Sequence, residues 1–151
     1  MSVSRVFGVK GRWRMELRGP DGEIKEVREG NNVVTDVGKE FIASFLYSAA
    51  AAAATNTARY IAIGTDATAE AASNTALGTE VSRVSGIVSY VSNQIYRVTA
   101  TFATGSGTGA IAEYGLFSSL TAGTLVARDT ESVINKGAND TLTVLAAFTI
   151  S

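Results

Sequence analysis

Four charged residues stand in otherwise neutral surroundings and are the first candidates for chemistry: Glu80, Arg83, Glu113 and Arg128. Hydrolysis of a glycosidic bond needs two carboxyl groups held roughly 5 to 9 Å apart in a cleft. Glu80 and Glu113 could take those two roles in a polysaccharide hydrolase. The competing interpretation is that each charge is paired so that it fits within a packed sheet. The sequence favours pairing, and we predict that Glu113 forms an ion pair with Arg83 or Arg128.

Other residue types that carry chemistry are few. The segment 105–109, with the sequence GSGTG, has the composition of a phosphate-binding loop, but neither Lys-Ser/Thr nor a helical pattern follows it. We therefore predict a loop between strands. The chain has no cysteine and no histidine, which removes disulfides, the usual zinc ligands and the commonest general base. We expect a protein that is not an enzyme and has no catalytic residue, metal ligand or cofactor.

Charge is unevenly distributed along the 151 residues. The first 40 positions hold 8 Lys/Arg and 7 Asp/Glu, which leaves twelve charged residues for the other 111 positions. A net charge of -1 argues against a dedicated nucleic-acid-binding protein, which needs a basic surplus. Soluble monomers keep apart by means of charged surfaces, so a segment this poor in charge predicts that part of its surface is covered by another protein.

The positioning elements are mainly strands. Strict alternation over residues 12–18 places Trp13, Met15 and Leu17 on one face, which predicts a half-buried strand. The turn sequence GPDG and a second polar strand over residues 24–29 complete a predicted β-hairpin. From Val81 onward, short strands alternate with turn signals, which is typical of a sandwich or a barrel.

One helix interrupts the strands. Apolar residues recur at helical spacing near residues 36–47, after Thr35 or Asp36, either of which can cap a helix. The alanine tract over residues 49–54 is compatible with an extension of this helix or with a loop. The fold class we predict is all-β, mainly an antiparallel β-sandwich or barrel-like, with this one short helix. It forms a single β-rich domain over residues 12–151.

Residues 1–11 are predicted to be an amino-terminal arm. Four apolar side chains lie there without a strong strand or helix pattern: Val3, Val6, Phe7 and Val9. A terminus of this composition is ordered when something buries it. We expect these four residues to contact a neighbouring subunit or a capsid, with an extra strand of the same domain as the alternative.

An ordered set of segments carries a resemblance to a known family. These segments are GNNVVTDVGKEFIA, YIAIGT, ALGTEVSR, IAEYGLF, GTLVAR and DTLTV. The set covers about residues 30–151 and resembles the capsid decoration, or cement, proteins of tailed bacteriophages. It is similar also to phage tail-fibre and minor tail proteins.

The resemblance implies a virion structural protein and supplies several expectations. A decoration protein is a small β-rich homotrimer that binds the major capsid protein on the outer capsid surface. It stabilises the shell by bridging neighbouring capsomers, after synthesis in the host cytoplasm. The resemblance implies no catalytic residue, and we expect neither nucleic acid nor membrane as a partner. A tail-fibre or minor tail component is the alternative, and a polysaccharide hydrolase domain is a more distant one.

Overall fold

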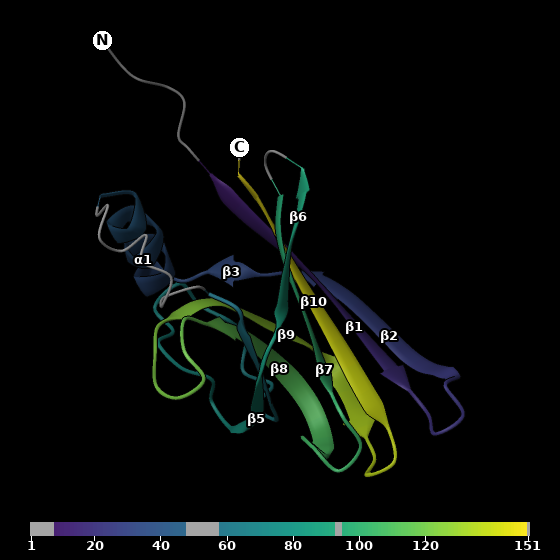
Figure 1. The fold of residues 1–151 in the computed structure, drawn as a ribbon. Coiled ribbons are helices and arrows are strands. Elements are labelled where there is room, and N and C mark those ends of the chain that lie inside the picture. Colours follow the sequence, from purple (N-terminus) through teal and green to yellow (C-terminus); the bar gives the residue numbers. More distant parts are fainter. Residues whose placement is uncertain (1–7, 48–57, 93–94, 151) are drawn as a thin grey trace.

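The computed structural model describes residues 8–47, 58–92 and 95–150, and its strands are arranged in two antiparallel sheets (Figure 1). The first sheet has the order β2-β1-β10-β7-β6 and the second β3-β9-β8-β4-β5. This architecture confirms the prediction of an all-β fold with one short helix. The elements are β1 (Val9–Arg18), β2 (Ile24–Asn31), β3 (Val33–Val34), α1 (Asp36–Tyr47), β4 (Tyr60–Gly64), β5 (Glu80–Ser85), β6 (Ile87–Ser92), β7 (Ile95–Phe102), β8 (Gly109–Phe117), β9 (Leu125–Lys136) and β10 (Thr141–Ile150).

The core lies between the two sheets. Trp13, Met15 and Leu17 alternate with charged residues along β1 and are buried, as the period-two pattern predicts. Ile63 of β4 and Tyr114 of β8 face them from the second sheet and belong to the same apolar cluster. The fold is therefore a sandwich whose inner faces are apolar.

Each lateral side of the sandwich is formed by a chain segment that leaves one sheet and enters the other. β2 of the first sheet leads through Asn32 into β3 of the second, and β5 of the second leads through Gly86 into β6 of the first. Strands that switch sheets in this way form the corners of a sandwich. A Cβ on Gly86 would lie 2.5 Å from Val98 Cγ1, so this corner needs glycine.

Thr35 caps helix α1 and ties it to β9. Its side-chain oxygen accepts a hydrogen bond from the amide of Gly38 at 3.0 Å, as an N-cap does, and its hydroxyl donates to the carbonyl of Leu125. A Cβ on Gly38 would lie 2.1 Å from the Val126 carbonyl oxygen, so glycine permits the close approach of helix and strand. None of the helices in the described residues is both long and apolar enough to span a membrane.

One predicted boundary differs from the observed one. β1 begins at Val9 and not at residue 12, because β10 extends to Ile150 and supplies a partner for Val9. Residues 9–11 therefore belong to the β-rich domain and not to the arm. β9 continues past Thr130 to Lys136, with an irregularity in its pairing with β8. The alanine tract lies outside the described residues.

Candidate interaction surface

Glu113 and Arg128 form an ion pair on the outer face of the second sheet. Arg128 Nη2 lies 2.9 Å and Nε 3.1 Å from Glu113 Oε2, and both side chains are almost completely buried. Arg83 pairs instead with Glu80, at 2.7 Å, and lies 3.5 Å from the centre of the Phe117 ring. Of the two arginines considered for Glu113, the structure places Arg128 beside it.

The Glu113–Arg128 pair anchors the loop between β4 and β5. Glu113 accepts hydrogen bonds from the amides of Gly78 at 2.9 Å and Thr79 at 2.7 Å. Arg128 donates to Asn74 Oδ1 at 3.2 Å. A buried ion pair is stable only when additional hydrogen bonds satisfy its remaining polar groups, and here loop atoms supply those bonds. Both charges are thus committed to the fold of their own chain.

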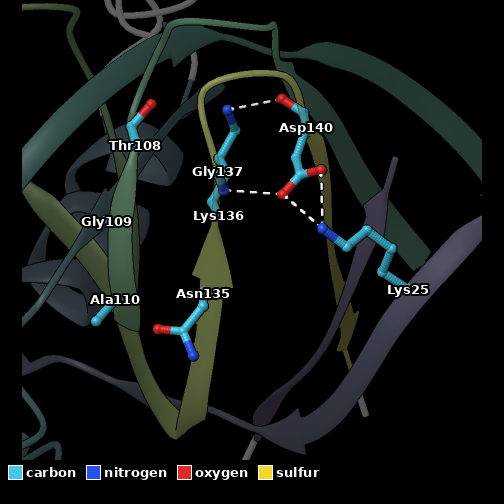
Figure 2. A pocket seen from close by; sticks show the side chains of 8 residues that line it. All are labelled: Lys25, Thr108, Gly109, Ala110, Asn135, Lys136, Gly137 and Asp140. Carbon is cyan, nitrogen blue, oxygen red and sulfur yellow. Dashed lines mark hydrogen bonds and ion pairs between the residues drawn. The ribbon is translucent and has the colours of Figure 1, made fainter. Parts of the chain in front are cut away.

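A shallow pocket of about 390 Å³ lies beside the turn between β9 and β10. Figure 2 shows that its charged groups are bound to one another. The carboxylate of Asp140 accepts from Lys25 Nζ at 3.1 Å and from the amide of Gly137 at 2.8 Å, and these bonds lower the pKa of Asp140. Lys136 Nζ donates to two backbone carbonyls, those of Ala103 and Asp140. These contacts fix the turn and join it to β2.

Buried polar groups gather between the sheets near Gly30. Asp129 Oδ2, the Tyr114 hydroxyl and Trp13 Nε1 are buried without a hydrogen-bond partner among the described residues. Burial, together with the nearby carboxylates of Glu131 and Glu70, raises the pKa of Asp129 to about 7. Within the same described residues, no group of three or more acidic, histidine or cysteine side chains is arranged to hold a metal ion.

The β2–β3 side of the sandwich carries charges that are bound by the same chain. β2 contains Lys25, Glu26, Arg28 and Glu29. Besides the bond from Lys25 to Asp140, Arg28 Nε donates to Ser132 at 2.7 Å, and Glu29 pairs with arginines of β1. Charged side chains on an edge strand discourage pairing with another chain. This side of the first sheet is therefore protected against strand addition.

The opposite edge of the first sheet is uncharged. β6 contains no charged residue, and Ile87 is 77% exposed and Val88 37%. Ser89 is also exposed, and within the described part of the chain no strand pairs with β6 on the side away from β7. A neutral edge strand with exposed apolar side chains is a template for pairing with another chain. We identify β6 as the candidate interaction surface.

The outer face of the first sheet beside β6 carries neutral residues and one arginine, Arg97 of β7, which pairs with Ser89 of β6 and with Ala147 of β10. Ile87 pairs with Thr99 of β7, which pairs with Leu145 of β10. Thr101 and Thr143 pair one step further along and are hydrogen-bonded at 3.0 Å through their hydroxyls. More charge lies on β1, whose outward residues are Lys10, three arginines and Glu16. Apart from Arg97, the half of this face that borders the open edge is neutral.

The four residues proposed for the arm fall into two groups. Val3, Val6 and Phe7 lie outside the described residues. Val9 lies in β1, is partly buried and packs against the core of its own domain. The sequence does not reveal β6 as an edge strand, because a short uncharged strand has the same pattern whether it lies at the centre of a sheet or at its edge.

Comparison with known proteins yields no relative: no protein-family model, curated protein or solved structure matches this chain. The two sides of the sandwich and the composition of the chain therefore provide the observations that bear on function.

Proposed function

We propose that this chain is a structural protein of a virion that binds the outer surface of the capsid and bridges neighbouring capsomers. The observation that carries the proposal is the neutral, open β6 edge, which adjoins a sheet face where Arg97 is the one charged residue on β7 and β10. Such a surface gains free energy when another protein covers it, through apolar burial and main-chain hydrogen bonds. The resemblance of the ordered segments to phage decoration proteins supports the choice of a capsid as the partner.

The distribution of charge fits this role. Ion pairs and hydrogen bonds within the chain engage Glu113, Arg128 and Asp140, so these charges hold the sandwich together. Binding to the shell would then depend on the uncharged surface of each copy, and many copies would bind. Several weak contacts made by one assembly give strong attachment. Once one contact has formed, it holds the remaining contacts at a high effective concentration. A rigid sandwich with one neutral side is suited to such repeated bridging.

Electron cryomicroscopy of purified virions, with and without bound Fab fragments raised against this chain, tests the proposal. Fab density is expected on the outer capsid surface, at positions where neighbouring capsomers meet. Density on the tail alone would assign the chain to a tail-fibre or minor tail role and overturn the capsid proposal. Absence of the chain from virions that are infectious and complete would overturn both virion roles.

A second measurement tests stabilisation of the shell. Capsids stripped of this chain are expected to release their DNA at a lower temperature than complete capsids, and the purified chain should restore the original temperature when added back. The chain carrying Ile87→Lys provides the variant with an altered neutral edge, and Ile24→Lys, on the charged edge, provides the matched control. Equal restoration by both variants would contradict a role for β6 in binding the shell.

A further inference from the structure

The outer face of the first sheet carries a positive charge that the chain as a whole does not. Along β1, β10 and β7, which lie side by side (Figure 1), side chains point alternately into the core and outward. The charged residues on the outward side are five basic and two acidic ones: Lys10, Arg12, Arg14, Arg18 and Arg97, with Glu16 of β1 and Glu29 of β2. These residues give the face a net charge of +3, whereas the chain has a net charge of -1.

Two of the basic residues on this face have no acidic partner among the described residues. The three arginines of β1 each pair with Glu16 or Glu29. Lys10 and Arg97 make no ion pair within the described part of the chain. Arg97 Nε is also buried, and it has no hydrogen-bond partner among those residues. A buried donor without an acceptor is rare in folded proteins, so an acidic group supplied by another molecule would stabilise Arg97.

Arg97 and Arg12 lie on either side of Ala147. Ala147 of β10 pairs with Arg12 of β1 and with Arg97 of β7. Because neighbouring strands lie about 4.8 Å apart, the Cα atoms of the two arginines are separated by roughly 10 Å across the short alanine side chain. Lys10 precedes Arg12 by two residues and points to the same side, roughly 7 Å away along the strand. Three long basic side chains therefore lie around one short residue.

We propose that the basic cluster of Lys10, Arg12 and Arg97 binds an acidic, extended segment of a partner protein. This inference goes beyond the proposed function, because it assigns a second contact surface and the chemistry of its ligand. A carboxylate matches a guanidinium through two parallel hydrogen bonds, and such charge-assisted bonds are stronger than neutral ones. In an extended segment, every second side chain points to the same side, at intervals of about 7 Å. Acidic residues at alternate positions would therefore face the basic cluster together.

Nucleic acid is the other polyanion to consider, and it fits this face less well. Proteins that bind single strands stack the bases on aromatic side chains, and the outward residues of β1, β7 and β10 include no aromatic one. Outside this face the chain has twelve acidic and eight basic residues. A long polyanion would be repelled by that surplus of acidic residues, whereas a short acidic segment would contact the basic cluster alone.

Fluorescence anisotropy with labelled peptides tests the proposal. The probe is a short peptide in which glutamate alternates with threonine, and the matched probe has glutamine in place of every glutamate. Full-length wild type, Arg97→Gln and Lys39→Gln are compared, after circular dichroism has verified that each variant is folded. Lys39 is exposed on α1 and pairs with Asp36 of the same helix. Lys39→Gln therefore removes the same charge as Arg97→Gln, but away from the basic cluster.

Wild type should bind the glutamate peptide more tightly than the glutamine peptide, and added salt should reduce the difference, because salt screens exposed charges. Arg97→Gln should weaken binding of the glutamate peptide at least about fivefold, which is typical of the loss of one close ion pair. Lys39→Gln should change it by less than about twofold, since a distant charge is screened. Equal binding of the two peptides by wild type would overturn the proposal. Equal losses in the two variants would overturn it too, because only net charge would then matter.

Nuclear magnetic resonance locates the contact without any substitution. The backbone amide signals of Arg12, Arg97 and Ala147 should shift when the glutamate peptide is added to wild type, and shifts confined to the second sheet would overturn the proposal. An oligodeoxythymidine with the same charge as the peptide is the competing ligand. Tighter binding of this oligonucleotide than of the glutamate peptide would overturn the proposal in favour of nucleic acid. None of these results depends on where the chain lies in a virion, so this inference and the proposed function can fail separately.

Discussion

The two lateral sides of the sandwich differ in the charge of the edge strand that each one exposes. On one side, β2 is rich in charge, and Lys25 and Arg28 are tied to Asp140 and Ser132 of the same chain. On the other side, β6 is uncharged, with Ile87 exposed and no partner strand in the described residues beyond it. Edge strands usually carry charged side chains or other features that prevent pairing with another chain. Of these two edges, β6 is therefore the one on which an added strand would meet no charged side chain of the edge strand itself.

The interior of the protein contains paired charges, and the open edge strand contains none. Glu113 and Arg128 are buried together and hydrogen-bonded to a loop, whereas the β6 edge has no charge to pair. Substitutions in the buried pair should therefore change stability, and substitutions on β6 should change assembly. This separation of effects can be tested directly.

Glu113→Ala should cause the largest loss of stability. The substitution leaves the Arg128 guanidinium buried without its main partner, and breaking a buried pair costs about 3 to 5 kcal/mol. Urea unfolding followed by circular dichroism measures the change in the free energy of unfolding. Glu80→Ala is the matched control, since its carboxylate is partly exposed and its loss should cost less. A Glu113→Ala protein as stable as wild type would contradict the assignment of this pair to the fold.

Asp129→Asn should stabilise the protein in a pH-dependent manner. Because burial raises the pKa of Asp129 from 3.8 to about 7, the folded chain holds a proton that the unfolded chain releases. Stability should then fall as the pH rises from about 4 to about 7. Asparagine resembles the protonated form, so the variant should gain about 2 to 4 kcal/mol at pH 8 and little at pH 4.

Melting temperatures of wild type and Asp129→Asn across this pH range provide the measurement. Glu131→Gln is the control: burial also raises the pKa of Glu131, but this residue is less buried, so a smaller gain is expected. An equal gain from Asp129→Asn at pH 4 and pH 8 would contradict the titration of this group.

Asp140→Ala should have a smaller effect than Glu113→Ala, because it removes a charge-assisted bond from the amide of Gly137 and the contact with Lys25. Since the pKa of Asp140 is lowered in the folded chain, its contribution is present above its unfolded pKa and is lost as the pH falls through the folded pKa. Thermal melts at pH 7 and at pH 3 measure both effects. Lys25→Met should cost less than 1 kcal/mol, since Lys25 is partly exposed. A larger loss of stability from Lys25→Met than from Asp140→Ala would contradict the importance of the bond between Asp140 and the amide of Gly137.

The sequence allowed much of the fold to be predicted, but less of the surface. Period-two alternation identified β1, and helical spacing identified α1, because each element buries a single face. The start of β1 at Val9 depends on pairing with Ile150, far away in the sequence, so local pattern does not reveal it. The choice of Arg128 over Arg83 for Glu113 depends likewise on the register of β8 against β9. The position of β6 at a sheet edge follows from topology alone.

Sedimentation equilibrium of the wild-type chain, Ile87→Lys and Ile24→Lys measures whether the β6 edge mediates self-association. The two isoleucines lie on opposite edges of one sheet and are 77% and 51% exposed, so each lysine should be tolerated by the fold. We predict that the wild type and Ile24→Lys form an oligomer at micromolar concentration. Ile87→Lys should weaken association at least about tenfold, or roughly 1.4 kcal/mol. A wild-type mass of 15.7 kDa, or equal association of the two variants, would contradict the account.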